Sequence, residues 1–208
     1  MIKNNKNLFF SFEGPEASGK SSQLKLLSIY MSKKKIPHLI TREPGGTTNA
    51  EKLRKIILDK KEKISSTEEI LLFMAARLNH INKVIKPALK VGKIVISDRF
   101  ADSTFVYQGY VNNYGMNKTI SLHKLLLSNF LPQKTFLFLL SSKQINERLR
   151  NRKLRNKYDK LDSTFHNKVI KGYKYLSKNN KRFCIIKADQ SRDKIHKQII
   201  KYFKYTYG

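Results

Sequence analysis

The sequence predicts an α/β protein in which five parallel strands form one sheet with helices on both faces. Two observations predict this fold class. Short apolar, β-branched or aromatic segments alternate along the chain with longer segments of helical periodicity. Glycine-rich and charged segments come directly after three of the predicted strands, which is where parallel sheets bind their ligands.

Each predicted strand is a short apolar run between turn residues, as expected for a buried strand. The strands are expected at Leu8–Phe12, His38–Thr41, Ile94–Ser97, Thr135–Leu140 and Phe183–Ile186. Each predicted helix repeats its apolar residues with helical spacing. The helices are expected at Lys20–Lys33, Asn49–Leu58, Thr67–Lys90, Leu122–Ser128, Lys143–Arg152, Ser163–Lys178 and Arg192–Phe203. Because strand and helix alternate, right-handed crossovers should cover both faces of the sheet.

The length of 208 residues suits one domain, residues 1–208, with a buried core. Cys184 is the single cysteine and lies in the apolar run FCII, so we expect a reduced core thiol. The chain has no apolar run of about 18 residues, and its start, MIKNNKNLFF, lacks the apolar region of a signal peptide. We therefore expect a cytoplasmic protein without a membrane segment.

The formal net charge of +28 raises the alternative of nucleic-acid binding. The lysines are spread over most segments rather than gathered in one stripe, and abundant Asn, Ile, Tyr and Phe accompany them. This composition is typical of AT-rich codons. We therefore interpret the lysines as solvated surface residues and do not expect a nucleic-acid partner.

The segment GPEASGKS follows the first predicted strand and fits the pattern G-x-x-x-x-G-K-[ST]. In this phosphate-binding loop (P-loop), backbone N–H groups and a helix N-terminus surround a phosphate, so a nucleotide site is predicted. Lys20 should reach the outer phosphates, the Ser21 hydroxyl should ligate Mg²⁺, and Glu16 should face a second ligand rather than a triphosphate. The predicted nucleotide-binding residues are Gly14, Pro15, Glu16, Ala17, Ser18, Gly19, Lys20 and Ser21.

Two further strand ends carry charged residues. Asp98 ends the buried run IVISD, where a carboxylate needs a cation or hydrogen-bond donors. Mg²⁺, through water, and Arg99 are the expected partners of Asp98, and an ion pair with Arg99 alone is the structural alternative. Arg42 can clamp a phosphoryl group. This positive charge suits phosphoryl transfer, because the transition state spreads negative charge over oxygen atoms.

Phe73 and Arg77 lie four residues apart on the predicted helix and therefore share a face. An aromatic ring beside a guanidinium can stack on a base and hydrogen-bond it. Taken by themselves, however, Phe73 fits a core position and Arg77 a solvated charge. Tyr107 and Gln108, in STFVYQG, are likewise compatible with purely structural roles, as a packed side chain and a turn residue.

Five segments occur in this order across nearly the whole chain: FEGPEASGKSSQ, TREPGGT, LLFMAARLNH, SDRFADSTFVYQG and YDKLDSTFHNKVIKGYKYL. Together they resemble the segments that thymidylate kinases of the bacterial type carry in the same order. The chain resembles that family. The resemblance implies a P-loop kinase that transfers the γ-phosphoryl group of ATP to dTMP, uses Mg²⁺ and forms a homodimer.

The resemblance also implies residue roles in a dTMP pocket. Phe73 would stack on thymine, Arg77 would bond its exocyclic carbonyl, and Gln108 would meet its imide edge. Tyr107 would contact the sugar and Glu16 would lie near the 3′-hydroxyl. The remaining implied roles are the base pocket for Pro44, Ser103 and Thr104, and the acceptor phosphate for Arg42 and Arg99.

The basic segment RLRNRKLRNKYDK predicts a short exposed lid at about 148–160. Because this P-loop has no arginine, the resemblance implies a catalytic arginine from the lid, with Arg152 and Arg155 as the main candidates and Arg150 as a further one. Lys160 and Asp162 replace the arginine and glutamate of the family's D-R-x-E pattern, which puts lid closure in question. Ala17 stands where the family usually has glycine, and a positive φ there would strain it by about 1 kcal/mol.

Two alternatives remain open from the sequence. A kinase for another acceptor, such as dUMP, a deoxyguanylate or a nucleoside, is the first, because one methyl group contributes only about 1–3 kcal/mol to discrimination. A basic P-loop protein that binds nucleic acid without kinase activity is the second, and salt-sensitive DNA binding would distinguish it.

Overall fold

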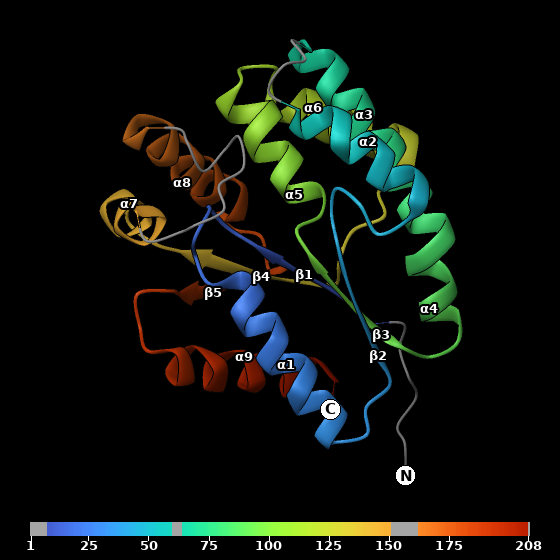
Figure 1. Cartoon of the computed structure of the whole chain (residues 1–208), viewed down its shortest axis with the longest axis vertical. Helices are drawn as coiled ribbons and strands as arrows, with labels where there is room; N and C mark the ends of the chain where they lie inside the picture. The colour runs from blue at the N-terminus through green and yellow to red at the C-terminus, as the bar shows by residue number, and fades with distance from the viewer. Residues whose placement is uncertain (1–7, 60–63, 151–161, 208) are drawn as a thin grey trace.

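One parallel sheet forms the centre of the computed structural model, which describes residues 8–59, 64–150 and 162–207. The strand order is β2-β3-β1-β4-β5, and every neighbouring pair is parallel (Figure 1). The strands are β1 (Phe9–Glu13), β2 (His38–Arg42), β3 (Ile94–Asp98), β4 (Lys134–Leu139) and β5 (Phe183–Lys187). Each boundary lies within one residue of its expected position, so the predicted five-stranded parallel sheet is confirmed.

Helices cover both faces of the sheet, as expected. α1 and α9 lie on one face, while α3 to α6 and α8 lie on the other (Figure 1). None of the described helices is long and apolar enough to cross a bilayer. The helices are α1 (Lys20–Lys33), α2 (Thr48–Leu58), α3 (Ser66–His80), η1 (Ile81–Ile85), α4 (Lys86–Lys90), α5 (Ala101–Thr104), η2 (Phe105–Val111), α6 (Met116–Leu127), α7 (Ser142–Arg150), α8 (Ser163–Ser177) and α9 (Arg192–Tyr207), of which η1 and η2 are π-helical.

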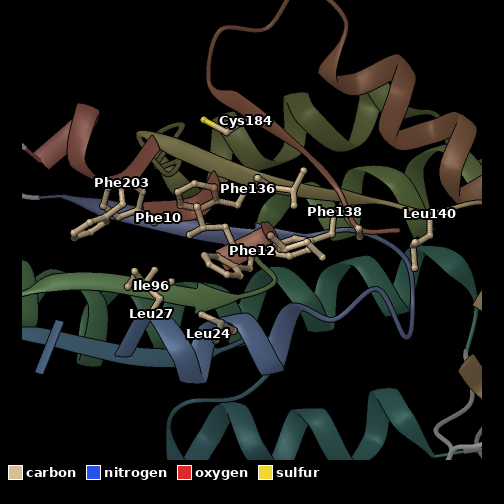
Figure 2. Packing of buried hydrophobic residues seen from close by; sticks show 14 of the residues in the cluster. Phe10, Phe12, Leu24, Leu27, Ile96, Phe136, Phe138, Leu140, Cys184 and Phe203 are labelled. Carbon is tan, nitrogen blue, oxygen red and sulfur yellow. The ribbon is translucent and has the colours of Figure 1, made fainter. Parts of the chain in front are cut away.

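Aromatic side chains of β1 and β4 fill the core on the α1 and α9 side (Figure 2). The ring centroids of Phe10 and Phe12 lie 5.9 and 5.1 Å from that of Phe136, and Phe203 of α9 lies 5.7 Å from Phe10. Burying a phenylalanine contributes roughly 1.5–3 kcal/mol, so these contacts hold β1 firmly where it enters the P-loop. Cys184 is buried in the same cluster, as expected.

The helix expected over Thr67–Lys90 contains a π-helical turn. α3, η1 and α4 follow one another without a break, and the backbone stays right-handed at Ile81 and Lys86. Pro87 lies at the start of α4 and has no N–H to donate to the carbonyl one turn earlier. The wider turn before this proline fits that missing bond.

The segment after β3 is more helical than the sequence predicted. α5 and η2 occupy residues 101–111, where no helix was predicted and where Gln108 fitted a turn, and α6 begins at Met116 rather than at Leu122. Gly109 weakens a helix signal locally. In the structure, a Cβ on Gly109 would lie 2.8 Å from Oγ1 of Thr119 and 3.0 Å from the Met116 backbone, so glycine permits the close approach of η2 and α6.

Candidate active site

The predicted site residues gather in one pocket of about 560 Å³ at the carboxyl ends of β1, β2 and β3. Gly14 and Pro15 belong to the same loop and contribute backbone carbonyls to it. Arg152 and Arg155 lie outside the described residues. The predicted residues that line the pocket are Glu16, Ala17, Ser18, Gly19, Lys20, Ser21, Arg42, Pro44, Phe73, Arg77, Asp98, Arg99, Ser103, Thr104, Tyr107 and Gln108.

The P-loop between β1 and α1 has a backbone that few residues tolerate. Gly14 has a φ of 138°, and a Cβ there would collide with the carbonyl oxygen of Phe138. Ala17 has a φ of 53°. Alanine therefore does occupy the left-handed region, at a cost of about 1 kcal/mol.

The Lys20 ammonium is held inside the P-loop. Its Nζ donates to the carbonyl oxygens of Gly14 at 3.1 Å and Pro15 at 2.7 Å, and to Ser18 Oγ at 3.2 Å. Burial, together with the nearby Arg99, lowers the pKa of Lys20 to about 8. These neutral carbonyls compensate the ammonium only in part, so an anion in the loop would stabilise its charged form.

Ser21 and Asp98 form the pair of oxygen groups suited to Mg²⁺. Ser21 Oγ donates to Asp98 Oδ2 at 2.9 Å across the junction of α1 and β3. The described residues contain no cluster of three His, Cys, Asp or Glu side chains that could hold a metal. This donor set fits Mg²⁺, which keeps several waters and binds through few protein oxygens together with substrate phosphates.

The Glu16 carboxylate lies in the pocket beside Arg99 and Tyr107. Its Oε1 accepts from Arg99 Nη2 at 2.8 Å, and its Oε2 accepts from the Tyr107 hydroxyl at 2.6 Å. Burial would raise the pKa of Glu16, but Arg99, Lys20 and the Tyr107 hydrogen bond outweigh burial and lower it. Arg99 therefore pairs with Glu16 rather than with Asp98, so the expectation that Arg99 is a partner of Asp98, whether beside Mg²⁺ or alone, is wrong.

Arg99 occupies a strained backbone position. Its φ of 67° lies in the left-handed region, which costs a non-glycine residue roughly 1–2 kcal/mol. Its N–H donates to the Phe12 carbonyl at 3.0 Å, and its carbonyl accepts from Ser97 Oγ at 2.6 Å. Such strain persists when surrounding bonds impose it, and it is common at functional sites.

Three guanidinium groups line the pocket near Asp98. Besides Arg99, they are Arg42, which pairs with Glu51 at 2.9 Å, and Arg54 of α2, which donates to the Pro44 carbonyl at 2.6 Å. Burial, followed by Arg42, lowers the pKa of Arg54. Cations that repel one another in this way form a site for an anion.

Sequence reasoning missed Arg54. The signal available was an arginine on the helix directly after REPGGT, but the periodicity of a short helix does not say which of its charged residues faces a ligand.

The predicted base-binding residues form the far end of the pocket, where Phe73 lies beside Arg77 on α3. Gln108 Nε2 donates to Glu69 Oε2 at 2.8 Å, which fixes the orientation of its amide. An aromatic face, a guanidinium and an amide thus line the same pocket, and these groups suit a nucleobase.

Arg77 is fully buried, so the interpretation of this residue as a solvated charge is wrong. Its Nε donates to Glu43 Oε2 at 2.7 Å and its Nη2 to Thr104 Oγ1 at 2.8 Å. His80 contacts the other Glu43 oxygen at 2.9 Å. Burial of a guanidinium requires such partners, and sequence reasoning did not identify Glu43 as the principal one.

Arg148 of α7 borders the P-loop side of the pocket. Its guanidinium donates to the Ala17 carbonyl at 3.2 Å and to the Ala188 carbonyl at 2.9 Å. It lies at the start of the expected lid, whose remaining residues from 151 to 160 are outside the described part of the chain. Arg148 thus connects the P-loop with the segment after β5.

A P-loop after β1, a Ser–Asp pair beside it and the arginines Arg42, Arg54 and Arg99 in the same pocket define a P-loop NTPase fold with the site of a phosphotransferase. A sequence model described as thymidylate kinase matches residues 12–199. The chain belongs to the thymidylate kinase family.

Individual relatives agree with this family. The chain is 42% identical over 198 residues to a thymidylate kinase of Mycoplasma capricolum, covering 93% of each chain. It is 40% identical over 204 residues to one of Rickettsia bellii, covering 97% of this chain and 98% of the relative. The crystal structure of thymidylate kinase from Ehrlichia chaffeensis matches with a TM-score of 0.76 and 32% identity, covering 95% of this chain and 98% of that one.

Proposed function

We propose that the protein transfers the γ-phosphoryl group of ATP to dTMP, giving dTDP and ADP for dTTP synthesis in the cytoplasm. The observation that carries this proposal is the continuity of the pocket, which runs from the P-loop at Lys20 to the base-binding end at Phe73. Arg99 and Glu16, which form an ion pair, line the same pocket. The donor and acceptor nucleotides can therefore meet end to end in one cavity.

Catalysis would rest on positioning and charge rather than on a protein nucleophile. Lys20 would release the loop carbonyls and bind the transferred phosphoryl group. Arg99, Arg42 and Arg54 would hold the acceptor phosphate in line with it. Mg²⁺, held by Ser21 with Asp98, would supply charge neutralisation at the donor phosphates. Arg152 or Arg155 would add a further positive charge from the lid.

The acceptor would be recognised through its base and sugar. Thymine would stack on Phe73, with Arg77 at its exocyclic carbonyl and Gln108 at its imide edge. Pro44, Ser103 and Thr104 would complete the base pocket. The Tyr107 ring, held by its bond to Glu16, would contact the deoxyribose, and Glu16 would lie near the 3′-hydroxyl.

A coupled assay of ADP release tests the proposal at physiological salt with ATP, Mg²⁺ and one acceptor at a time. We expect rapid turnover with dTMP and much slower turnover with dUMP, dGMP, dCMP and UMP. A rate with dUMP close to the rate with dTMP would remove the assignment of the pocket to thymine but would leave the kinase activity in place. If none of the acceptors were phosphorylated and the protein bound DNA in a salt-sensitive way, the nucleic-acid alternative would replace the proposal.

We also propose that the protein is a homodimer that buries the exposed leucines of α3 and α6. These helices adjoin (Figure 1), and Leu71 and Leu78 of α3 and Leu125 and Leu126 of α6 remain exposed on them. Adjacent exposed leucines favour an interface over free solvent.

In sedimentation equilibrium we expect twice the chain mass for the wild type and the mass of one chain for the double variant Leu78→Glu/Leu125→Glu. Val91→Glu, at an exposed site after α4, is the control, and a monomeric wild type would contradict the proposal.

A further inference from the structure

Glu13 ends β1, and its carboxylate is completely buried next to the pocket. It does not line the pocket, so a substrate would not contact it. A buried carboxylate is unfavourable unless several donors surround it. Its partners therefore indicate what it does.

Two hydroxyl groups lie between Glu13 and Arg99. Ser103 Oγ and the Tyr173 hydroxyl donate to Glu13 Oε2 at 2.7 and 2.9 Å. Arg99 Nη1 donates to the same two hydroxyl oxygens at 3.0 and 3.4 Å. Each hydroxyl has one proton. Because each hydroxyl donates its proton in a hydrogen bond to Glu13, the lone pairs of the hydroxyl oxygen remain free to accept from the guanidinium of Arg99.

Glu13 also holds the backbone next to Arg99. The N–H of Phe100 donates to Glu13 Oε1 at 2.6 Å, directly after the left-handed residue Arg99. The same carboxylate thus fixes the main chain that follows Arg99 and the hydroxyls that receive its guanidinium.

Among the charges around Glu13, that of Arg99 stabilises the ionised carboxylate. Burial, followed by the charge of Asp102, raises the pKa of Glu13 to about 7, and Arg99 opposes this rise. Asp102 itself is bound bidentately by Arg182 at 2.7 and 2.8 Å. Glu16 is bound by Arg99 on the opposite side.

We propose that Glu13 is a positioning residue for the transfer reaction, whose carboxylate orients Arg99 through Ser103, Tyr173 and the Phe100 N–H. This inference rests on the proposed role of Arg99 at the acceptor phosphate. Glu13 acts through these groups and does not contact the substrates.

The test is Glu13→Gln, which keeps the shape of the side chain but places an NH₂ donor where a carboxylate oxygen accepted. The hydroxyls of Ser103 and Tyr173 must then turn their protons away from residue 13, toward Arg99. We expect kcat/KM for dTMP to fall by about ten- to hundredfold, with KM for ATP unchanged. Tyr173→Phe should lower the same constant less, because it removes only one shared hydroxyl.

A double-mutant cycle with Arg99→Ala separates positioning from general destabilisation. We expect Glu13→Gln to have no further effect on kcat/KM for dTMP when Arg99 is absent. Asp102→Asn is the control, since it neutralises a neighbouring buried carboxylate that pairs with Arg182. It should lower the melting temperature but not kcat/KM for dTMP of the folded enzyme, because removing the Asp102 charge favours the ionised form of Glu13.

Additive effects in the cycle would overturn the proposal, as would a Glu13→Gln enzyme with wild-type constants. If Glu13→Gln does not fold, the cycle is run with Tyr173→Phe, and additivity there has the same meaning. A normal rate for Arg99→Ala alone would instead remove the role of Arg99, and the role of Glu13 with it.

Discussion

Arg99→Ala is expected to lower turnover with dTMP by about 10²–10³-fold while ATP binding stays nearly unchanged. Arg99 is a partly buried guanidinium in the pocket, and Glu16, Ser103 and the Gly14 carbonyl hold it there. A fixed cation in a water-poor site stabilises developing negative charge at this scale. Because it faces the acceptor half, its loss should affect the transfer far more than the binding of ATP.

Initial rates with dTMP and equilibrium binding of ATP check this expectation. Lys204→Ala is the charge-matched control, because Lys204 is exposed on α9 and does not line the pocket. Loss of Arg99 leaves Glu16 buried without its main cation, so turnover is normalised to the folded fraction measured by circular dichroism. Unchanged turnover would remove Arg99 from the catalytic site.

The fold was predictable because its signals are local. Each strand is a short apolar run, the three central strands β1, β3 and β4 are buried almost throughout, and each strand boundary was found within one residue. The P-loop was predictable for the same reason, since Gly14 and Lys20 belong to one continuous pattern. The helical segment at 101–111 was missed because Gly109 weakens the local signal, and the close approach to α6 that this glycine permits is visible only in the structure.

The candidate site was predictable as a set of residues but not as a set of contacts. Arg54, Glu43 and Glu13 belong to no pattern that identifies them, and their roles follow from distances between segments far apart in the chain. Arg77 shows the limit clearly. By itself a helical arginine suggests a solvated charge, whereas the fold places a carboxylate 34 residues away against it.

Arg77→Met is therefore expected to reduce the free energy of unfolding by about 3–5 kcal/mol and to raise KM for dTMP. Methionine preserves the packing volume of the side chain, but it leaves Glu43 as a buried carboxylate without its guanidinium, which is the costly step. His80 still contacts the other Glu43 oxygen, so a value near the lower end is expected. Denaturant unfolding measures the loss, and adding Glu43→Gln should restore part of it, because no buried charge then remains unpaired.

Arg182→Met is the matched control for both effects of Arg77→Met. Arg182 also pairs with a buried carboxylate, that of Asp102, and is itself mostly buried, so its loss should destabilise the fold through the same mechanism. Arg182 does not line the pocket, and KM for dTMP should stay at the wild-type value. If both variants raised KM equally, the effect of Arg77 would be explained by stability alone, and its contact with the base would be excluded. If only Arg77→Met raises KM, this buried arginine both holds the core together and recognises the acceptor.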